Sequence, residues 1–318
     1  MGHFIINIIA VAGILLSTLV VYLKLAPKLG LFDTPNERSS HSQVTIRGAG
    51  IIYPIALLLY GLMNDFYPIS IIVGGILLGI LSFIDDWKNL SARFRLGLHA
   101  LIIGWCLYEL NWESNYFWLI PFAVFLYLWL MNAYNFMDGI NGITALNTFS
   151  VLLALFFLNL MHPFTNSFLL LILLIATVLF SFFNLRTKAI CFLGDVGSIP
   201  LGFVLIGLTL WAVSAIGDLN PLVFFVVYMI DSGWTIIQRM IAKENILKPH
   251  RKHLYQVLAN EKQWAHLNVS FLFFLVQMGI NVLYFSSHWP KHLFLLITFL
   301  VLSLLYLVIK RSLLQSKN

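Results

Sequence analysis

The sequence has little charge. Only 10% of its 318 residues are charged, 60% are hydrophobic, and the mean hydropathy is +0.90. Soluble domains carry about 25% charged residues, so this composition excludes an ordinary soluble protein and predicts a protein that resides in a lipid bilayer. The alternating pattern of a membrane β-barrel is also lacking, whereas long continuous apolar runs are frequent. The sequence therefore predicts an all-α, polytopic integral membrane protein.

Cysteine and long polar segments are scarce too. The two cysteines, Cys106 in an apolar run and Cys191 in a short polar segment, are too few for a thiolate metal site, and no disulfide is expected. Because no clear internal repeat and no long polar segment interrupts the apolar runs, we expect a single transmembrane domain over residues 1–318. No basic residue precedes the first run, residues 4–23, which is therefore expected to be a retained span and not a signal peptide.

The apolar runs predict about eleven transmembrane helices, if each span takes roughly 17–25 residues and shorter spans are tolerated inside a bundle. The predicted spans are residues 4–23, 48–63, 68–84, 96–110, 116–133, 143–161, 167–184, 199–216, 221–237, 267–285 and 293–309. With this count, all lysines and arginines except Lys291 fall on one side of the membrane. Positive charge marks the cytoplasmic side, so we expect a periplasmic N-terminus and a cytoplasmic C-terminus. Topology thus accounts for the net charge of +6 and argues against nucleic-acid binding.

Polar residues concentrate in five segments on this predicted cytoplasmic face. The first contains Arg38 and Arg47 among hydroxyl groups and before a predicted helix, which suits a phosphate site, although topology also favours arginine there.

The second segment is the pair Asp85 and Asp86 at the end of an apolar run. Two adjacent carboxylates near hydrocarbon repel each other, so a metal ion or a proton is expected to compensate them; two solvated loop acids are the alternative.

The third and fourth segments combine acids with glycines. Asn135, Asp138 and Asn141 recur every three residues in a segment without any basic residue, and this spacing allows them to face one pocket. A helix cap followed by a turn is the alternative. Asp195 lies between two glycines before an apolar run, where it suits either an N-terminal cap or a magnesium ligand.

The fifth segment carries His250, Arg251 and His253. Histidines at positions i and i+3 share a helix face, and with the arginine they form a cationic cluster suited to a diphosphate; a zinc site would need further ligands. Asp231 lies apart, within an apolar run. An intramembrane carboxylate is a candidate functional residue, although pairing with Arg239 or with a neighbouring helix is an equal alternative.

Taken together and in order, these segments resemble the polyprenyl-phosphate N-acetylhexosamine-1-phosphate transferases. The matching stretches read DTPNERSSH with IRGAG, FIDD, NAYNFMDGING, FLGDVGS and PHRKHLYQ. The resemblance implies a bacterial inner-membrane enzyme with active-site loops on its cytoplasmic face. It would use Mg²⁺, with Mn²⁺ as the alternative ion, to transfer a sugar-1-phosphate from a UDP-N-acetylhexosamine to undecaprenyl phosphate and release UMP. The RSSH and HRKHLYQ forms look more like the O-antigen-initiating branch than the phospho-MurNAc-pentapeptide translocase, so the expected donor carries GlcNAc or a 6-deoxy sugar such as QuiNAc or FucNAc.

The same resemblance implies a role for each matching residue. The expected roles are catalysis by Asp85, Asp86 and Asp138, magnesium binding by Asp195, and substrate binding by Arg38, Arg47, Asn135, Asn141, His250, Arg251 and His253. Within the last group, the two arginines would meet the lipid phosphate and the histidine segment would hold the donor diphosphate. Many members have an acid where this chain has Asn141, and some have one where it has Asn89, so a carboxylate role at these two positions is in doubt.

The mechanism and the function class leave alternatives. A phosphate monoester has a second pKa near 6 and is largely ionised at neutral pH, which favours direct attack by the lipid phosphate over a covalent aspartyl intermediate. A proton-coupled transporter or lipid flippase using Asp231 is the alternative function, but it predicts polar groups that reach the midplane from both sides. The expected partners are the lipid bilayer, undecaprenyl phosphate and the UDP-sugar, and a homodimer is left open.

Overall fold

The computed structural model describes residues 2–35, 40–41, 43–88, 90–110, 120–246, 250–287 and 291–315, and about four-fifths of them are helical. The α-helices are α1 (Gly2–Leu25), α2 (Ile52–Met63), α3 (Ile69–Lys88), α4 (Ala92–Glu109), α6 (Ile120–Phe136), α7 (Ile143–Met161), α8 (Ser167–Asn184), α9 (Asp195–Ile216), α10 (Val226–Ile241), α11 (Leu254–Gln256), α12 (His266–Ser286) and α13 (Lys291–Gln315). Shorter helical turns are η1 (Ala26–Leu29), η2 (Ala49–Ile51), η4 (Asn220–Phe225) and η5 (Val257–Glu261). The strands β1 (Phe32–Asp33) and β2 (Thr45–Ile46) pair antiparallel.

The helices follow the predicted spans closely. In the described part of the chain, every predicted span overlaps a helix, and eight helical stretches are long and apolar enough to cross a membrane. Residues Ala49–Met63 and Ile120–Phe136 form shorter apolar helices. The prediction of an all-α polytopic membrane protein is thus confirmed, whereas the count of eleven spans and their orientation stay predictions.

Several helices extend beyond the predicted ends, among them α3 and α9. Helix α3 continues to Lys88 instead of ending at residue 84, and α9 begins at Asp195 instead of residue 199. These two predicted spans stop short of the nearest charged residue, whereas the backbone hydrogen bonds of the helix continue past that residue. Asp85 and Asp86 therefore lie in the last turn of α3, and Asp195 lies in the first turn of α9, where the helix N-terminus favours negative charge.

Helix α9 forms the centre of the bundle. It is largely buried and packs against α3, α6 and α7. Glycines allow the closest approaches: a Cβ placed on Gly50 of η2 would lie far inside van der Waals contact with the Cα of Gly197 in α9. The start of α9 is therefore held directly against the segment that follows β2.

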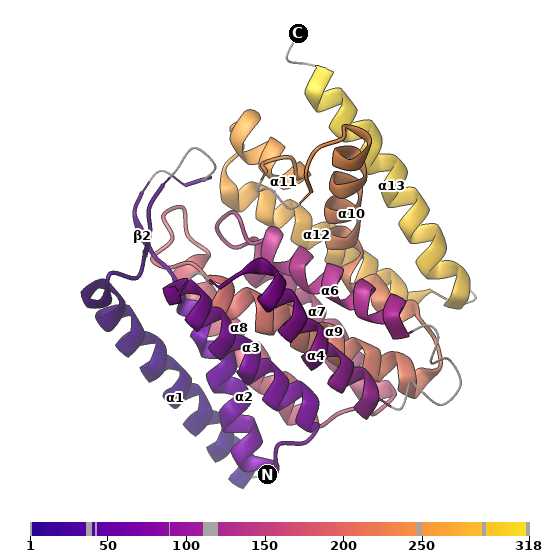
Figure 1. Cartoon of the computed structure of the whole chain (residues 1–318). Helices are drawn as coiled ribbons and strands as arrows, with labels where there is room; N and C mark the ends of the chain where they lie inside the picture. Colours follow the sequence, from indigo (N-terminus) through magenta and orange to yellow (C-terminus); the bar gives the residue numbers. More distant parts are fainter. Residues whose placement is uncertain are drawn as a thin grey trace.

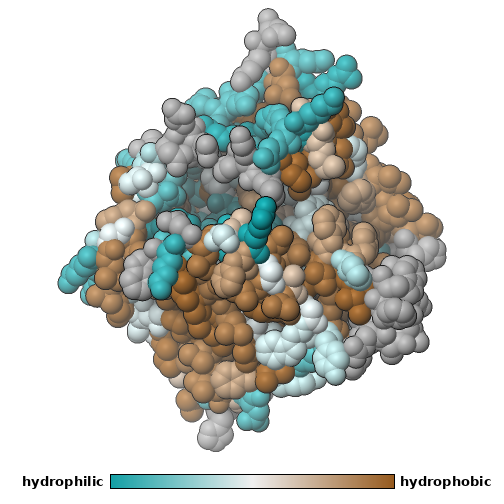
Figure 2. Space-filling model, viewed as in Figure 1, coloured by the Kyte–Doolittle hydropathy of each residue, from teal (hydrophilic) through white to brown (hydrophobic). Residues whose placement is uncertain are grey.

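Hydrophilic residues gather at one end of the bundle. The start of α1 and the end of α13 lie at opposite ends, and β2 and α11 lie at the end where α13 finishes (Figure 1). In the same view, hydrophilic surface gathers over this end and hydrophobic surface covers the helices below it (Figure 2). We call this region, which includes β1, β2, the end of α3, the start of α9 and α11, the polar end.

Gly50→Ala should destabilise the protein, because its methyl group would overlap backbone atoms of Gly197 that cannot rotate away. Overpacking of this kind costs about 1–3 kcal/mol, more than alanine gains from its helix propensity. The midpoint of thermal unfolding in detergent should fall. Gly104→Ala in α4 is the matched control, since its Cβ would have no neighbour within 4 Å. Equal midpoints for the two variants would contradict the close packing.

Candidate active site

The segment around β2 is fastened to the segment that precedes α9. Ile46 forms a parallel bridge with Cys191, and Phe192 N donates to Ile46 O over 2.8 Å. The ladder continues as Ala49 N donates to Phe192 O (3.0 Å) and Gly50 N donates to Leu193 O (2.9 Å). These backbone bonds bring two segments that are distant in sequence together and place Arg47 beside the first turn of α9.

Arg47 bridges two of the predicted site carboxylates. Its Nη2 lies 2.8 Å from Asp86 Oδ1 and 3.2 Å from Asp195 Oδ1. The hydroxyl of Tyr22 donates to the carbonyl oxygen of Arg47 over 2.5 Å and so fixes the backbone. Burial would lower the pKa of Arg47, but the charges of Asp195 and Asp86 outweigh it and raise that pKa. The guanidinium therefore stays charged and offsets part of the negative charge of the two acids.

Asp85 faces the other way from Asp86. Its side chain is 9% exposed, pairs with Arg95 of α4, and accepts a hydrogen bond from Leu90 N over 2.8 Å. Each member of the Asp pair thus has its own arginine. Two arginines therefore supply positive charge beside the pair, and the expected metal ion or proton stays a prediction. Arg95 had been counted only as a topological charge, so its pairing was missed.

The predicted pocket around Asp138 forms in part. Asn135 Oδ1 accepts a hydrogen bond of 2.8 Å from the hydroxyl of Ser198, which lies one turn after Asp195 in α9. Burial, with a smaller contribution from the nearby charge of Asp195, raises the pKa of Asp138 to about 7. The Asp138 carboxyl is therefore partly protonated at neutral pH. Ser198 is a site residue that its motif contained but that the sequence analysis did not single out.

Asn141 does not share this arrangement. It is 5% exposed, and its amide donates to the carbonyl oxygens of Arg186 (2.8 Å) and Thr187 (3.2 Å). Its own carbonyl accepts a bond of 2.7 Å from Ser270 Oγ. The residues between α6 and α7 form turns and not a helix, so the three-residue spacing does not align the three side chains. In this structure Asn141 fastens the loop to its neighbours.

The histidine segment docks against the same loop. The ring centroids of His250 and His253 lie 4.9 Å apart. The hydroxyl of Tyr255 donates to Phe136 O over 2.8 Å, and a Cβ on Gly139 would collide with that hydroxyl. Tyr255, which the sequence analysis did not single out, thus connects the histidine segment to the Asn135 and Asp138 loop.

The charge of this segment differs from the expected one. Burial lowers the pKa of His250 to about 4, and His253 and neighbouring cations lower it as well, so this ring is neutral at physiological pH. The positive charge comes instead from side chains around an adjacent cavity of about 300 Å³. That cavity is lined by Thr235, Gln238, Arg239, Ala242, Glu244, Arg251, Lys252, Val257, Glu261, Lys310 and Leu314.

Of the remaining candidate residues, Arg38 lies outside the described residues and Asp231 has partners in two other helices. Asp231 does not pair with Arg239, which instead contacts Glu244 at 3.2 Å and donates to backbone carbonyls. The partners of Asp231 are the backbone of α11 and Tyr306 of α13, so the expected alternative of a neighbouring helix is the one that the structure has.

The acidic residues suit a magnesium ion in their chemistry. No group of three or more His, Cys, Asp or Glu side chains that could hold a metal occurs among the described residues. However, Mg²⁺ commonly takes only one or two carboxylates and fills its other positions with water and substrate phosphates. Asp86 and Asp195 both contact one nitrogen of Arg47, so the space between these two carboxylates already accommodates a cation.

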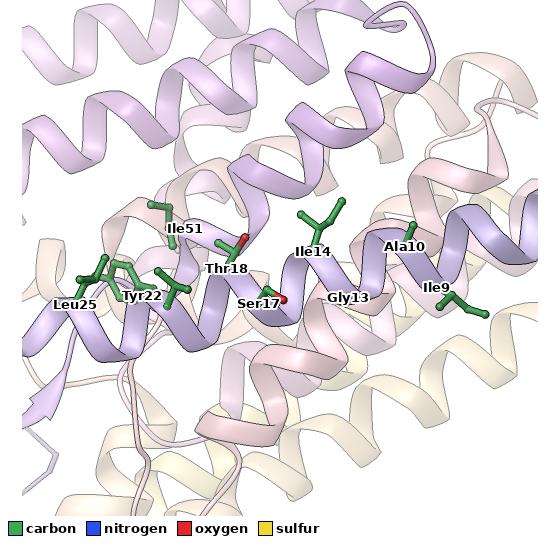
Figure 3. A pocket seen from close by; sticks show the side chains of 10 residues that line it. Ile9, Ala10, Gly13, Ile14, Ser17, Thr18, Tyr22, Leu25 and Ile51 are labelled. Carbon is green, nitrogen blue, oxygen red and sulfur yellow. The ribbon is translucent and has the colours of Figure 1, made fainter.

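An apolar groove runs along α1 and ends near Arg47. It has a volume of about 770 Å³ and is lined by Ile9, Ala10, Gly13, Ile14, Ser17, Thr18, Val21, Tyr22, Leu25 and Ile51. Figure 3 shows these side chains along one side of α1, with Ile51 beside Tyr22. Because the Tyr22 hydroxyl is hydrogen-bonded to the backbone carbonyl of Arg47, one end of the groove lies near the arginine that bridges the two carboxylates.

Comparison with known proteins agrees with the motifs. The model of glycosyl transferase family 4 matches residues 68–213. A protein of Bacillus subtilis named as a probable undecaprenyl-phosphate N-acetylglucosaminyl 1-phosphate transferase is 26% identical over 282 residues, which cover 79% of this chain and 75% of that protein. Undecaprenyl-phosphate alpha-N-acetylglucosaminyl 1-phosphate transferases of Thermotoga maritima and Salmonella typhimurium are 27% and 25% identical. Their alignments cover 90% and 92% of this chain, and 92% and 87% of the respective relatives. The comparisons therefore support the resemblance of this chain to the polyprenyl-phosphate N-acetylhexosamine-1-phosphate transferases that its motifs indicate.

Proposed function

We propose that this protein transfers N-acetylhexosamine-1-phosphate from a UDP-sugar to undecaprenyl phosphate and releases UMP. The observation that carries the proposal is the bridge from Arg47 to Asp86 and Asp195 at the polar end. Phosphoryl transfer depends chiefly on the neutralisation of charge and on positioning, and this cluster offers anionic ligands and a fixed cation within one site. The names of the relatives favour the same reaction.

The chain's own residues divide the task. A bound Mg²⁺ would neutralise the donor diphosphate, and Asp195 and Asp86 are the carboxylates that would hold it. Asn135 and Asp138 border this site from α6 and the loop after it. The cavity lined by Arg251 and Lys252 of the histidine segment would receive the donor diphosphate.

The reaction needs no strong base. An oxygen of the lipid phosphate forms a bond with the β-phosphorus of the UDP-sugar, while the bond from that phosphorus to the bridging oxygen breaks and UMP leaves. Because the lipid phosphate is largely a dianion at neutral pH, it attacks directly in this scheme, and no aspartyl intermediate is required. Asp85, paired with Arg95, holds the end of α3 so that Asp86 keeps its orientation.

The acceptor lipid fits the groove along α1. Its isoprenoid chain would lie against the apolar side chains there, and its phosphate would reach Arg47 at the groove's end. A Trp at Gly13, whose Cβ has no neighbour within 4 Å, would fill the groove without disturbing the bundle.

We further propose UDP-GlcNAc as the first donor to test, since the relatives are named for N-acetylglucosamine. UDP-QuiNAc and UDP-FucNAc follow, because the RSSH and HRKHLYQ motifs resemble the O-antigen branch. The product would start an O-antigen or a related surface polysaccharide at the inner membrane. Eleven spans, a periplasmic N-terminus and cytoplasmic active-site loops complete this proposal.

Purified protein mixed with Mg²⁺, undecaprenyl phosphate and a panel of UDP-N-acetylhexosamines should release UMP, and chelation of the metal should stop the release. Asp195→Asn should lower the rate about 100-fold or more, because a charged ligand at the reacting phosphates is lost. Asp65→Asn is the control: Asp65 has a positive φ, which asparagine also adopts, and belongs to no predicted motif. No turnover with any donor, or full turnover in Asp195→Asn, would sink the proposal.

Gly13→Trp should raise the KM for undecaprenyl phosphate about tenfold and leave the KM for the UDP-sugar unchanged, since it would displace part of the isoprenoid chain from the groove. Gly279→Trp in α12 is the matched control, because that glycine is also exposed and has no neighbour within 4 Å of its Cβ. Equal acceptor KM values in both variants would show that the lipid binds elsewhere.

The pH dependence of donor binding should not reflect His250. With a pKa of about 4, this ring is neutral throughout the range from pH 6 to pH 8, so no charge on it is lost as the pH rises. The donor KM of wild type and of His250→Gln, measured over this range, should follow curves of the same shape. A rise in the wild-type KM that the variant lacks would contradict a neutral His250.

A further inference from the structure

A chain of buried polar groups joins α13 to the histidine segment. Lys310 Nζ donates to the hydroxyl of Tyr306 (2.6 Å) and to Thr235 Oγ1 (3.2 Å). The hydroxyl of Tyr306 in turn donates to Asp231 Oδ1 over 3.2 Å. Lys310, Tyr306 and Asp231 are 3%, 4% and 1% exposed, and α10 and α13 run side by side (Figure 1). These hydrogen-bonded side chains therefore lie inside the protein and not on its surface.

Asp231 is the last of these hydrogen-bonded side chains and contacts the backbone of α11. Its carboxylate accepts backbone hydrogen bonds from Leu254 N (2.8 Å) and Tyr255 N (3.3 Å), which fix the first turn of α11. His253 immediately precedes that turn, and its Nδ1 lies 3.5 Å from Asp231 Oδ1. The same carboxylate thus holds the backbone of the motif and faces one nitrogen of its central ring.

The other nitrogen of that ring is left for a ligand. His253 is 2% exposed, and both of its ring nitrogens are buried without a hydrogen-bond partner in the part of the chain that the structure describes; Nδ1 has the Asp231 carboxylate 3.5 Å away, whereas no acid is paired with Nε2. A carboxylate beside Nδ1 favours the form of the ring that carries a hydrogen there, which leaves Nε2 as the nitrogen that meets a substrate. The tilted ring of His250 and the stacked ring of Tyr255, whose centroids lie 4.9 Å and 5.8 Å from that of His253, restrict its rotation.

The cost of these groups argues against a purely structural role. A buried lysine and a buried aspartate at a helix interface are expensive, and apolar residues of similar size commonly replace such pairs without loss of stability. The sequence predicts Lys310 only as one of the positive charges on the cytoplasmic face, and it leaves Asp231 as either a functional residue or a paired acid. Both side chains are buried beside the histidine segment, where their polar groups take part in the hydrogen bonds that hold it.

We propose that Asp231 is a positioning residue for His253, and that Tyr306 and Lys310 of α13 hold Asp231 in place. Asp231 keeps the hydrogen of the His253 ring on Nδ1 and aims Nε2 at the donor nucleotide-sugar. This inference rests on the proposed function, because it takes the donor as the ligand of the histidine segment. It gives the last helix, whose Lys310 and Leu314 also line the proposed donor cavity, a second role in the donor site.

The kinetic test uses Tyr306→Phe, which removes only a hydroxyl group and keeps the ring. The donor KM should rise about 10- to 160-fold, the range expected for the loss of one hydrogen bond to a charged group, while the acceptor KM and the thermal midpoint stay close to wild type. Tyr284→Phe in α12 is the matched control and should change neither KM. An active enzyme whose donor KM is the same in wild type, Tyr306→Phe and Asp231→Asn would overturn the proposal.

A second measurement needs no turnover, so it separates this inference from the proposed function. Protein with ¹⁵N-labelled histidine is reconstituted in liposomes, and the signal missing from His253→Gln identifies His253 by solid-state NMR. The wild-type ring should carry hydrogen on Nδ1, and Asp231→Asn, whose amide can donate to Nδ1, should move it to Nε2. A wild-type ring with hydrogen only on Nε2, or an identical signal in Asp231→Asn, would overturn the proposal even if the enzyme is active.

Discussion

The geometry of the polar end depends on one cation between two acids. Asp86 ends α3 and Asp195 begins α9, and both helices are apolar for most of their length. Two carboxylates at such helix ends would repel each other in a medium of low polarity, so the packing of α3 against α9 requires positive charge between them. Arg47 supplies it, and it stays there because its backbone is tied to residues 191–193 and to Tyr22. A short ladder of hydrogen bonds thus allows the central helices to meet at their charged ends.

The site is assembled from two halves with different supports. The acidic half is carried by α3, α6 and α9, which form the centre of the bundle. The histidine half is carried by α11 and held by Asp231 of α10. Tyr255 joins them, since its hydroxyl binds Phe136 O at the end of α6 and packs on Gly139. The relative position of the two halves therefore depends on this contact, and a glycine is needed at residue 139 because any larger side chain would push Tyr255 away.

Several positive residues serve both topology and structure. The positive-inside rule explains why Arg47, Arg95 and Lys310 lie at one face, but it does not explain their partners. Each of them contacts a specific acid or hydroxyl: Asp86 and Asp195 for Arg47, Asp85 for Arg95, and Tyr306 for Lys310. A charge that is needed for orientation in the membrane is thus also used to neutralise or position an acid.

Local patterns in the sequence predicted the all-α class and the positions of the helices, and they contained the motifs on which the family resemblance rests. Apolar runs report burial in lipid or in the bundle, and burial of backbone there requires helices. Only the tertiary structure decided that Asp85 and Asp86 face different arginines, that Asn141 fastens a loop, and that Asp231 supports His253. These outcomes join residues that are far apart in the sequence, such as Arg47 and Asp195 at a separation of 148 residues and Asp231 and Tyr306 at 75. A spacing rule describes one helix, whereas the partner of a buried charge is chosen by which helices pack together.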